Sequence, residues 1–163
     1  MKAFPCSVAA LCVALSGGLA LAETSEDAAL VWRADDPGLQ WGPCPAFLPE
    51  GCAIAVLHGD PAGPNADVFF RVPGGARIAR HWHSSAERMV LVSGELRVNY
   101  DGHPAATLRP GSYAYGPARL PHTAECLGDT PCVLTIAFEQ PVDAFEGAPE
   151  DAADMADADA DAE

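Results

Sequence analysis

The sequence predicts a single all-β domain, built as a sandwich or barrel of short strands. Glycine and proline number 15 each among 163 residues, which is too many for a helical bundle. Between residues 53 and 139, short apolar or alternating runs recur with turn residues between them, and no stretch shows convincing helical periodicity. The length leaves room for one domain, and 49% hydrophobic residues suffice for a packed core.

The N-terminus predicts a secretory signal peptide. Lys2 supplies a positive end, Val8 to Leu21 is a short apolar run, and Ala20 and Ala22 are the small residues that a signal peptidase recognises. We expect cleavage after Ala22, which would remove residues 1–22 and place the protein in a periplasm or outside the cell. The run is short for a bilayer span. The alternatives are an uncleaved anchor or a buried helix.

Residues 23–52 are expected to form a leader that packs on the barrel. The segment is rich in acidic residues, proline and glycine, but apolar side chains are spaced along it. Those side chains are Trp32, Leu39, Trp41, Phe47 and Leu48. Such anchors favour a segment that wraps onto a domain over a free linker.

The barrel itself is predicted over residues 53–140. Glycine and proline pairs such as Pro110-Gly111 mark the ends of its strands, and Asp101-Gly102 is a strong hairpin signal. The expected strands are 53–57, 68–72, 78–83, 87–92, 95–100, 106–108, 112–115, 122–126 and 133–138.

Cysteine usage predicts two disulfides. Cys6 and Cys12 would leave with the signal, and an even number of cysteines would remain in an oxidising compartment. Three pairings are open, and we favour the pairs nearest in sequence because each brackets a turn-rich stretch. These pairs are Cys44–Cys52 and Cys126–Cys132; the alternative is four free thiols.

The charge excludes two classes of partner. The net charge is −14 and Lys2 is the only lysine, so no basic patch is available for nucleic acid, and an anionic membrane would repel the mature protein. Residues 141–163 are predicted to be an acidic disordered tail, because residues 150–163 contain only Asp, Glu, Ala and one Met. The alternative is a tail that recruits cations or a partner with low affinity.

One segment predicts a metal site. His81 and His83 are two residues apart, so on a strand their side chains share a face. Ser84-Ser85-Ala86 reads as a turn, and Glu87 then begins the returning strand. Two imidazoles and a carboxylate that converge in this way supply most of the ligands of a first-row transition metal. The alternative is two exposed histidines beside a solvated glutamate.

The spacing around these residues resembles the first motif of the cupin family. That motif has a glycine, five residues, His-x-His, three residues, a glutamate, six residues and a glycine. Gly75, His81, His83, Glu87 and Gly94 fill every position.

A second cupin motif follows, and it is filled in part. Gly111, Pro117 and His122 match it, whereas Arg119 stands where the family usually has glycine and Cys126 where it usually has asparagine. The resemblance covers residues 53–139. Arg119 in place of glycine could alter the turn at the mouth of the barrel, or bring a positive charge near the pocket.

The resemblance implies a double-stranded β-helix, or jelly-roll, barrel with one divalent metal ion inside one end. Its ligands would be His81, His83, Glu87 and His122. Taken alone, His122 would more often be a histidine of the core or the surface. Mn, Fe, Ni, Cu and Zn all remain candidates, because relative affinities do not select among them. Cys126 is expected to point inward and to have a structural role.

Further residues have expected positions. We expect His58, His103, Arg80 and Arg88 on the outside of the barrel. The inward or outward direction of Trp82, Met89, Tyr113 and Tyr115 depends on a register of one residue that the sequence leaves open.

Three functions fit such a site. The first is a metal-dependent enzyme of oxygenase, isomerase or lyase type on a small organic substrate, since a metal with open positions can polarise an oxygen, activate water or bind dioxygen. The second is a non-catalytic protein that binds a small ligand or a metal. The third is a metal-stabilised barrel that forms a homodimer by exchange of its leader. An enzyme should have an acid or base within reach of the metal, whereas a binder should have an apolar pocket.

Overall fold

The computed structural model describes residues 29–149. The predicted signal peptide and residues 150–163 of the predicted tail lie outside the described residues. Within residues 29–149, no helix is both long and apolar enough to cross a membrane.

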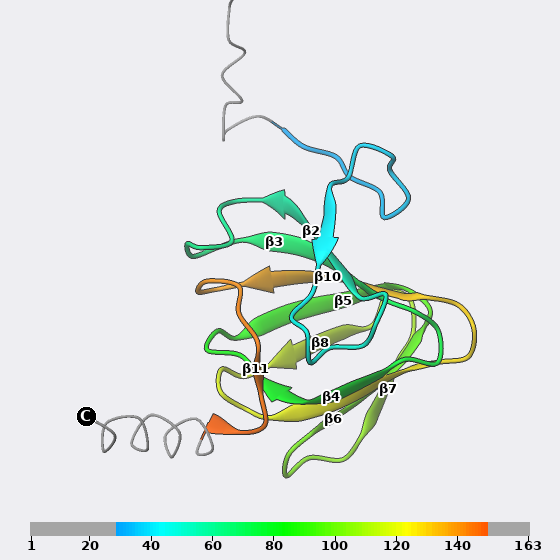
Figure 1. Ribbon diagram of the computed structural model, residues 1–163, viewed down its shortest axis with the longest axis vertical. Coiled ribbons are helices and arrows are strands. Elements are labelled where there is room, and N and C mark those ends of the chain that lie inside the picture. The colour runs from blue at the N-terminus through cyan, green and yellow to red at the C-terminus, as the bar shows by residue number, and fades with distance from the viewer. Residues whose placement is uncertain (1–28, 150–163) are drawn as a thin grey trace, which may run out of the picture.

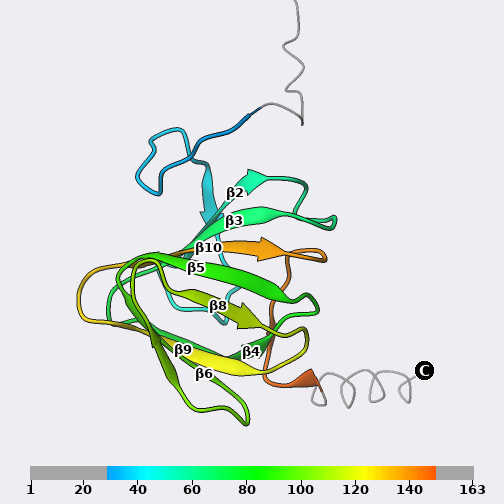
Figure 2. The same ribbon diagram turned by 180° about the vertical axis from the view of Figure 1, so that it is seen from behind.

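The described chain folds into two facing antiparallel sheets (Figures 1 and 2). The larger sheet has the strand order β1 (Trp41–Pro43), β2 (Ala53–His58), β3 (Asp67–Val72), β10 (Cys132–Phe138), β5 (Glu87–Ser93) and β8 (Tyr113–Gly116). The smaller sheet has the order β11 (Phe145–Glu146), β4 (Arg77–Trp82), β9 (His122–Leu127), β6 (Glu95–Tyr100) and β7 (Ala106–Leu108). From β3 onward the chain passes repeatedly from one sheet to the other, which is the jelly-roll arrangement, so the predicted all-β fold class is confirmed.

The alternation of side chains along the strands builds one core between the sheets. In β5, Glu87, Met89 and Leu91 are buried, whereas Arg88, Val90 and Val92 are exposed. This period of two is the geometry of a strand with one face on a core. The inner faces of both sheets join in a single cluster that includes Val68, Ile78, Leu91, Leu96, Val98, Leu134 and Ile136.

The expected strands are all present, with ends that differ by at most one residue. The sequence did not predict β1 and β11, which have three and two residues. Both are edge strands that exist through pairing with β2 and β4, not through a pattern of their own. In β1, Trp41 stacks on Phe69 with ring centroids 6.5 Å apart, so the leader contacts the larger sheet.

The favoured disulfide pairing is confirmed: Cys44 is bonded to Cys52, and Cys126 to Cys132. Cys126 and Cys132 are fully buried. This bond joins β9 of the smaller sheet to β10 of the larger sheet, so the inward direction and structural role expected of Cys126 are also observed.

The end of the barrel corrects a predicted boundary. Residues 141–147, here called the C-terminal strap, cross one end of the sheets from β10 to β4 (Figure 1). The backbone N–H of Val142 donates to the Pro61 carbonyl at 2.9 Å, and Phe145 stacks on Trp82 at 4.5 Å. The tail therefore does not begin at residue 141. The segment is held because its apolar residues and backbone groups find partners on the barrel, which composition alone did not indicate.

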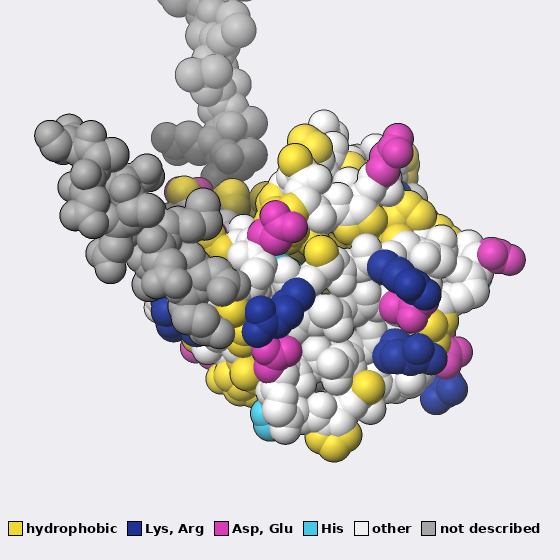
Figure 3. Space-filling view, turned by 60° about the horizontal axis from the view of Figure 1, so that its bottom comes forward, with side chains coloured by type: hydrophobic (Ala, Val, Ile, Leu, Met, Phe, Trp, Pro, Cys, Tyr) yellow, Lys and Arg dark blue, Asp and Glu magenta, His cyan; other side chains and the backbone are white. Residues whose placement is uncertain are grey.

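Arginines outside the barrel lie beside acidic side chains (Figure 3). Arg80 pairs with Asp101 at 2.5 Å and Arg88 with Glu139 at 2.6 Å. Both arginines therefore face outward, as expected. Exposed pairs of this kind contribute about 0–1 kcal/mol each.

Candidate metal centre

Three histidines converge at one end of the barrel interior. His81 lies near the end of β4, His83 follows that strand, and His122 begins β9, where it pairs in register with His81. One ring nitrogen from each lies within 4.8 Å of the other two. Since β4 and β9 are neighbours in the smaller sheet, their adjacent ends bring the two motifs of the sequence together.

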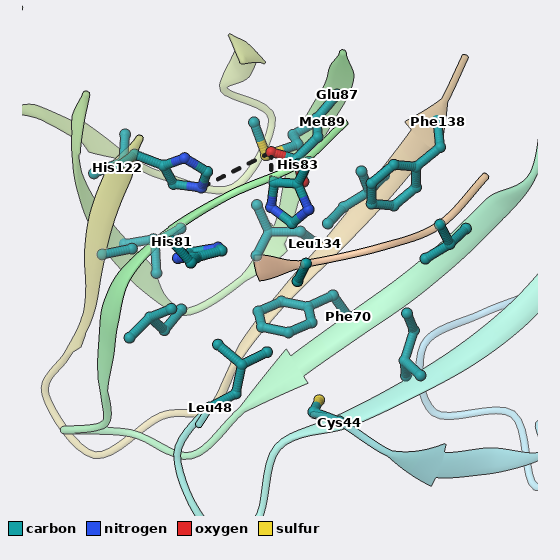
Figure 4. Close-up of a pocket in the computed structure, with 18 of the residues that line it drawn as sticks. Cys44, Leu48, Phe70, His81, His83, Glu87, Met89, His122, Leu134 and Phe138 are labelled. Carbon is teal, nitrogen blue, oxygen red and sulfur yellow. Dashed lines mark ion pairs between the residues drawn. The ribbon is translucent and has the colours of Figure 1, made fainter. Parts of the chain in front are cut away.

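Glu87 approaches the histidines from the opposite sheet. Its carboxylate Oε2 lies 3.4 Å from Nε2 of His83 and 3.9 Å from Nε2 of His122 (Figure 4). The turn between β4 and β5 carries the chain across from one sheet to the other. All four residues that the sequence singled out are buried and face the same cavity.

The outer nitrogen of each imidazole is held by the backbone. Nδ1 of His81 donates to the Ala79 carbonyl at 2.8 Å, and Nδ1 of His122 donates to the Leu120 carbonyl at 3.2 Å. Nδ1 of His83 donates to the carbonyl of Asp143 in the C-terminal strap. A carbonyl can only accept, so these bonds place a proton on Nδ1, and in a neutral ring Nε2 then has a free lone pair. Metal-binding histidines are commonly oriented in this way.

Electrostatics also favour a cation here. Burial and then the neighbouring His83 lower the pKa of His81 to about 4. Burial and then His81 lower the pKa of His122 to about 3, so both rings are neutral at neutral pH. Burial raises the pKa of Glu87. Neutral imidazoles and a desolvated carboxylate are suited to a divalent cation, which would compensate the buried negative charge.

The remaining walls of the site enclose an apolar cavity of about 260 Å³. The histidines and Glu87 lie at one end, and Leu48 and Cys44 of the leader lie at the other (Figure 4). Between them the walls are formed by Ile54, Phe70, Met89, Leu134, Ile136 and Phe138, among others. The leader thus supplies one wall of the cavity.

Sequence reasoning missed two residues of this site, Tyr100 and Asp143, which also line the cavity. Tyr100 lies against His122 with ring centroids 4.9 Å apart, and its buried hydroxyl has no hydrogen-bond partner among the described residues. Burial, and secondly the charge of Glu87, raise its pKa, so the hydroxyl keeps its proton. Tyr100 lies on the same face of β6 as buried Leu96 and Val98, and this period of two residues could have revealed it.

The other candidates lie elsewhere. Tyr113 and Tyr115 are 61% and 51% exposed on the outer face, and His58 and His103 are also exposed, whereas Met89 lines the cavity. Trp82 is buried under the C-terminal strap and the guanidinium of Arg119, which lies 4.9 Å from its ring centroid.

Arg119 therefore brings no charge into the cavity. Its φ of 62° is the left-handed conformation that a glycine adopts readily, so the turn is kept.

Comparisons with known proteins agree with this architecture. Residues 68–138 match the family model described as the cupin domain. These residues form a cupin domain. No curated protein matches the sequence.

Several solved structures are similar to the chain. One is the DMSP lyase DddQ from Ruegeria pomeroyi, at 22% identity and TM-score 0.58, covering 69% of this chain and 62% of that one. Another is the oxalate decarboxylase of Bacillus subtilis, at 25% identity and TM-score 0.52, covering 60% of this chain and 28% of that one. An oxalate oxidase matches at 18% identity and TM-score 0.52, covering 60% and 56%. The chain thus spans less than two thirds of the length of each, and the lyase and oxidase likenesses, below 25% identity, show a shared fold.

Proposed function

We propose that this protein is an exported cupin that holds one divalent transition metal ion through His81, His83, Glu87 and His122. We further propose that it acts as a metal-dependent enzyme on a small organic substrate. The observation that carries the proposal is the convergence of three imidazole nitrogens within 4.8 Å at the inner end of a cavity, with Glu87 beside them.

The chemistry of the donors fits such an ion. Nitrogen and carboxylate ligands suit Mn, Fe, Ni, Cu and Zn, and four protein ligands leave positions for a substrate in a five- or six-coordinate sphere. When bound, the metal would polarise a substrate oxygen, activate water or engage dioxygen according to its identity. The apolar walls exclude bulk water, which strengthens electrostatic interactions inside the cavity.

Tyr100 is the candidate acid of the site. Its hydroxyl remains protonated, is buried without a partner in residues 29–149, and belongs to the same cavity as the four proposed ligands. It could donate a hydrogen bond, and then a proton, to a substrate oxygen. An acid at this place is the feature that separates an enzyme from a simple binder.

The names of similar structures indicate which reactions to assay. They include proteins named as a DMSP lyase, an oxalate decarboxylase and an oxalate oxidase. Lyase, decarboxylation and oxygen-dependent reactions are therefore the classes to assay first. Fold alone does not select one of them.

Export rests on two supports. The sequence predicts a signal peptide cleaved after Ala22, and the mature part contains two disulfides, which persist in oxidising compartments. A periplasmic or secreted location accounts for both.

A second candidate function is non-catalytic ligand binding, which the apolar lining of the cavity favours. The two functions differ in one result. An enzyme loaded with its metal converts a substrate, and its turnover falls in Tyr100→Phe. A non-catalytic binder leaves its ligand chemically unchanged, both in the parent protein and in Tyr100→Phe.

Elemental mass spectrometry of the exported, untagged protein tests the metal site. We expect near-stoichiometric transition metal in the parent protein and loss of most of it in His122→Ala. The matched control is His103→Ala, which removes an exposed histidine and should keep the metal. A parent protein that folds but neither carries nor takes up metal would refute the proposal.

A further inference from the structure

The charge distribution around the cavity points to a class of ligand. Apart from the three histidines, the ionisable groups that line it are Glu87, Asp143 and Tyr100. Among the residues that the structure describes, no arginine or lysine lines the cavity. The carboxylate of Asp143 is engaged, because its Oδ1 accepts the backbone N–H of Ser84 at 2.8 Å.

The arginines nearest to the site in sequence are held outside. Arg80 pairs with Asp101, Arg88 pairs with Glu139, and Arg119 lies over Trp82. A ligand with a second anionic group would thus find no cation inside the cavity other than the metal. An unpaired charge buried among apolar side chains has a large desolvation cost, so this cavity opposes it.

The polar groups at the histidine end of the cavity indicate what one end of a ligand must contain. The buried Tyr100 hydroxyl is a donor without a partner in the described structure, and it lies beside the histidine end of the cavity. Gly116 leaves the room there, since a Cβ at this position would come 2.9 Å from the Tyr100 hydroxyl and 3.2 Å from Oε2 of Glu87. An uncharged oxygen at the metal could accept a hydrogen bond from this hydroxyl.

The other end of the ligand must be apolar. Leu48 and Phe70 line the cavity away from the histidines (Figure 4), and Ile54 also belongs to its lining. At about 30 Å³ for each water-sized group, a volume of 260 Å³ holds about nine non-hydrogen atoms. This corresponds to a short aliphatic or small aromatic body with one polar head.

We propose that the cavity takes a ligand with one oxygen-bearing, metal-binding head and an uncharged, apolar body of about six carbons. The head lies between the metal and Tyr100, and the body lies along Phe70 toward Leu48. A charged group at the far end of the ligand is rejected. The inference rests on the proposed function, because the head binds the metal.

Three hydroxamates test this selectivity, since they share one chelating head. We would load the protein with Co²⁺, confirm the metal content, and titrate acetohydroxamate, hexanohydroxamate and adipic monohydroxamate while recording the cobalt absorption. Burial of CH₂ groups gives about fourfold in affinity each, so hexanohydroxamate, with four more of them, should bind roughly 250-fold more tightly than acetohydroxamate. Adipic monohydroxamate differs from hexanohydroxamate only by a terminal carboxylate in place of a methyl group. Its affinity should be lower than that of hexanohydroxamate by about 100-fold or more.

Two neighbouring residues of β9 provide matched variants. Ala124 lines both the cavity and a groove on the outer face, whereas Thr123 lines only the groove. Ala124→Leu should reduce the preference for hexanohydroxamate over acetohydroxamate at least about fivefold. It should still bind acetohydroxamate, and this retained binding shows that the variant is folded. Thr123→Leu should change neither.

The outcomes separate the two proposals. If cobalt is retained and acetohydroxamate binds, but chain length has no effect or the carboxylate is tolerated, the inference on the ligand is overturned and the metal site stands. If the folded protein retains no cobalt, both are overturned.

Discussion

Nδ1 of His83 donates a hydrogen bond to the backbone carbonyl of Asp143, although the two residues are 60 positions apart in the chain. The Asp143 carboxylate also binds the backbone N–H of Ser84, the residue after His83. The C-terminal strap thereby fixes both the ring and the backbone of a proposed metal ligand.

This relationship predicts weaker metal binding in Asp143→Ala. Without its carboxylate anchor on Ser84, the strap should no longer hold the carbonyl against His83. Loss of such an outer partner typically lowers metal affinity by about 10- to 100-fold. Competition with a chelator measures the change. Glu139→Ala, which removes an exposed partner of Arg88, is the control and should keep the parent affinity; equal affinities in both variants would contradict the assignment.

The disulfide between Cys126 and Cys132 should stabilise the fold by constraining the unfolded chain. Closing so short a loop is worth about 2 kcal/mol in the chain-entropy description. We expect Cys126→Ala/Cys132→Ala to lower the free energy of unfolding by at least that amount in a denaturant titration. Removal of Cys44–Cys52 should cost a similar amount and also weaken hexanohydroxamate binding, because Cys44 lines the cavity. A reductant that leaves the parent's stability unchanged would contradict both expectations.

The elements with a local signal could be predicted from the sequence. Glycine and proline mark the strand ends, and the spacing from Gly75 to Gly94 brings together a motif whose histidines share a strand face. Tyr100 had a signal too, since it continues the alternation of Leu96 and Val98, but no metal motif includes it.

The remainder depends on tertiary contacts. β11 has two residues and is defined by its pairing with Trp82 and His81. Asp143 is one acidic residue among many near the C-terminus, and only the folded chain places it beside Ser84. Nor could the sequence show that Arg119 turns away from the cavity to lie over Trp82.

Acidification should destabilise the metal-free protein. The folded-state pKa values of His81 and His122 are lowered to about 4 and about 3, so protons bind these histidines more tightly in the unfolded chain. Their contribution to stability is complete above about pH 6.5 and is lost as the pH falls toward 4. The raised pKa of Glu87 has the opposite sign and offsets part of the loss.

Comparison of the parent protein with His122→Gln isolates the contribution of His122 to this pH dependence. Between pH 6.5 and 5.5 the free energy of unfolding of this variant should fall by about 1 kcal/mol less than that of the parent protein. Denaturant titrations of both metal-free proteins at the two pH values measure the difference. Equal losses would mean that His122 is not held neutral by burial.

Arg119 should be replaceable by the glycine that the family usually has. Its left-handed backbone is unfavourable for a residue with a side chain by about 1 kcal/mol, and its contact with the Trp82 ring is worth about 0.5–1 kcal/mol. These effects nearly cancel, so Arg119→Gly should leave the melting temperature within a few degrees of the parent value. Arg119→Val loses the ring contact and strains a β-branched residue, so it should cost more than 1 kcal/mol. A strongly destabilised glycine variant would show that the guanidinium has a larger role.

Tyr100→Phe should separate function from stability. The hydroxyl is buried and has no partner among the described residues, so its removal spares a desolvation cost and should raise the free energy of unfolding by about 1 kcal/mol. If the hydroxyl donates to a substrate oxygen, turnover should fall by about 100-fold while the metal content stays constant. The outer-face variant Tyr113→Phe should change neither quantity. A loss of stability in Tyr100→Phe would mean that the hydroxyl is satisfied inside the protein, and its assignment as the acid of the site would then be wrong.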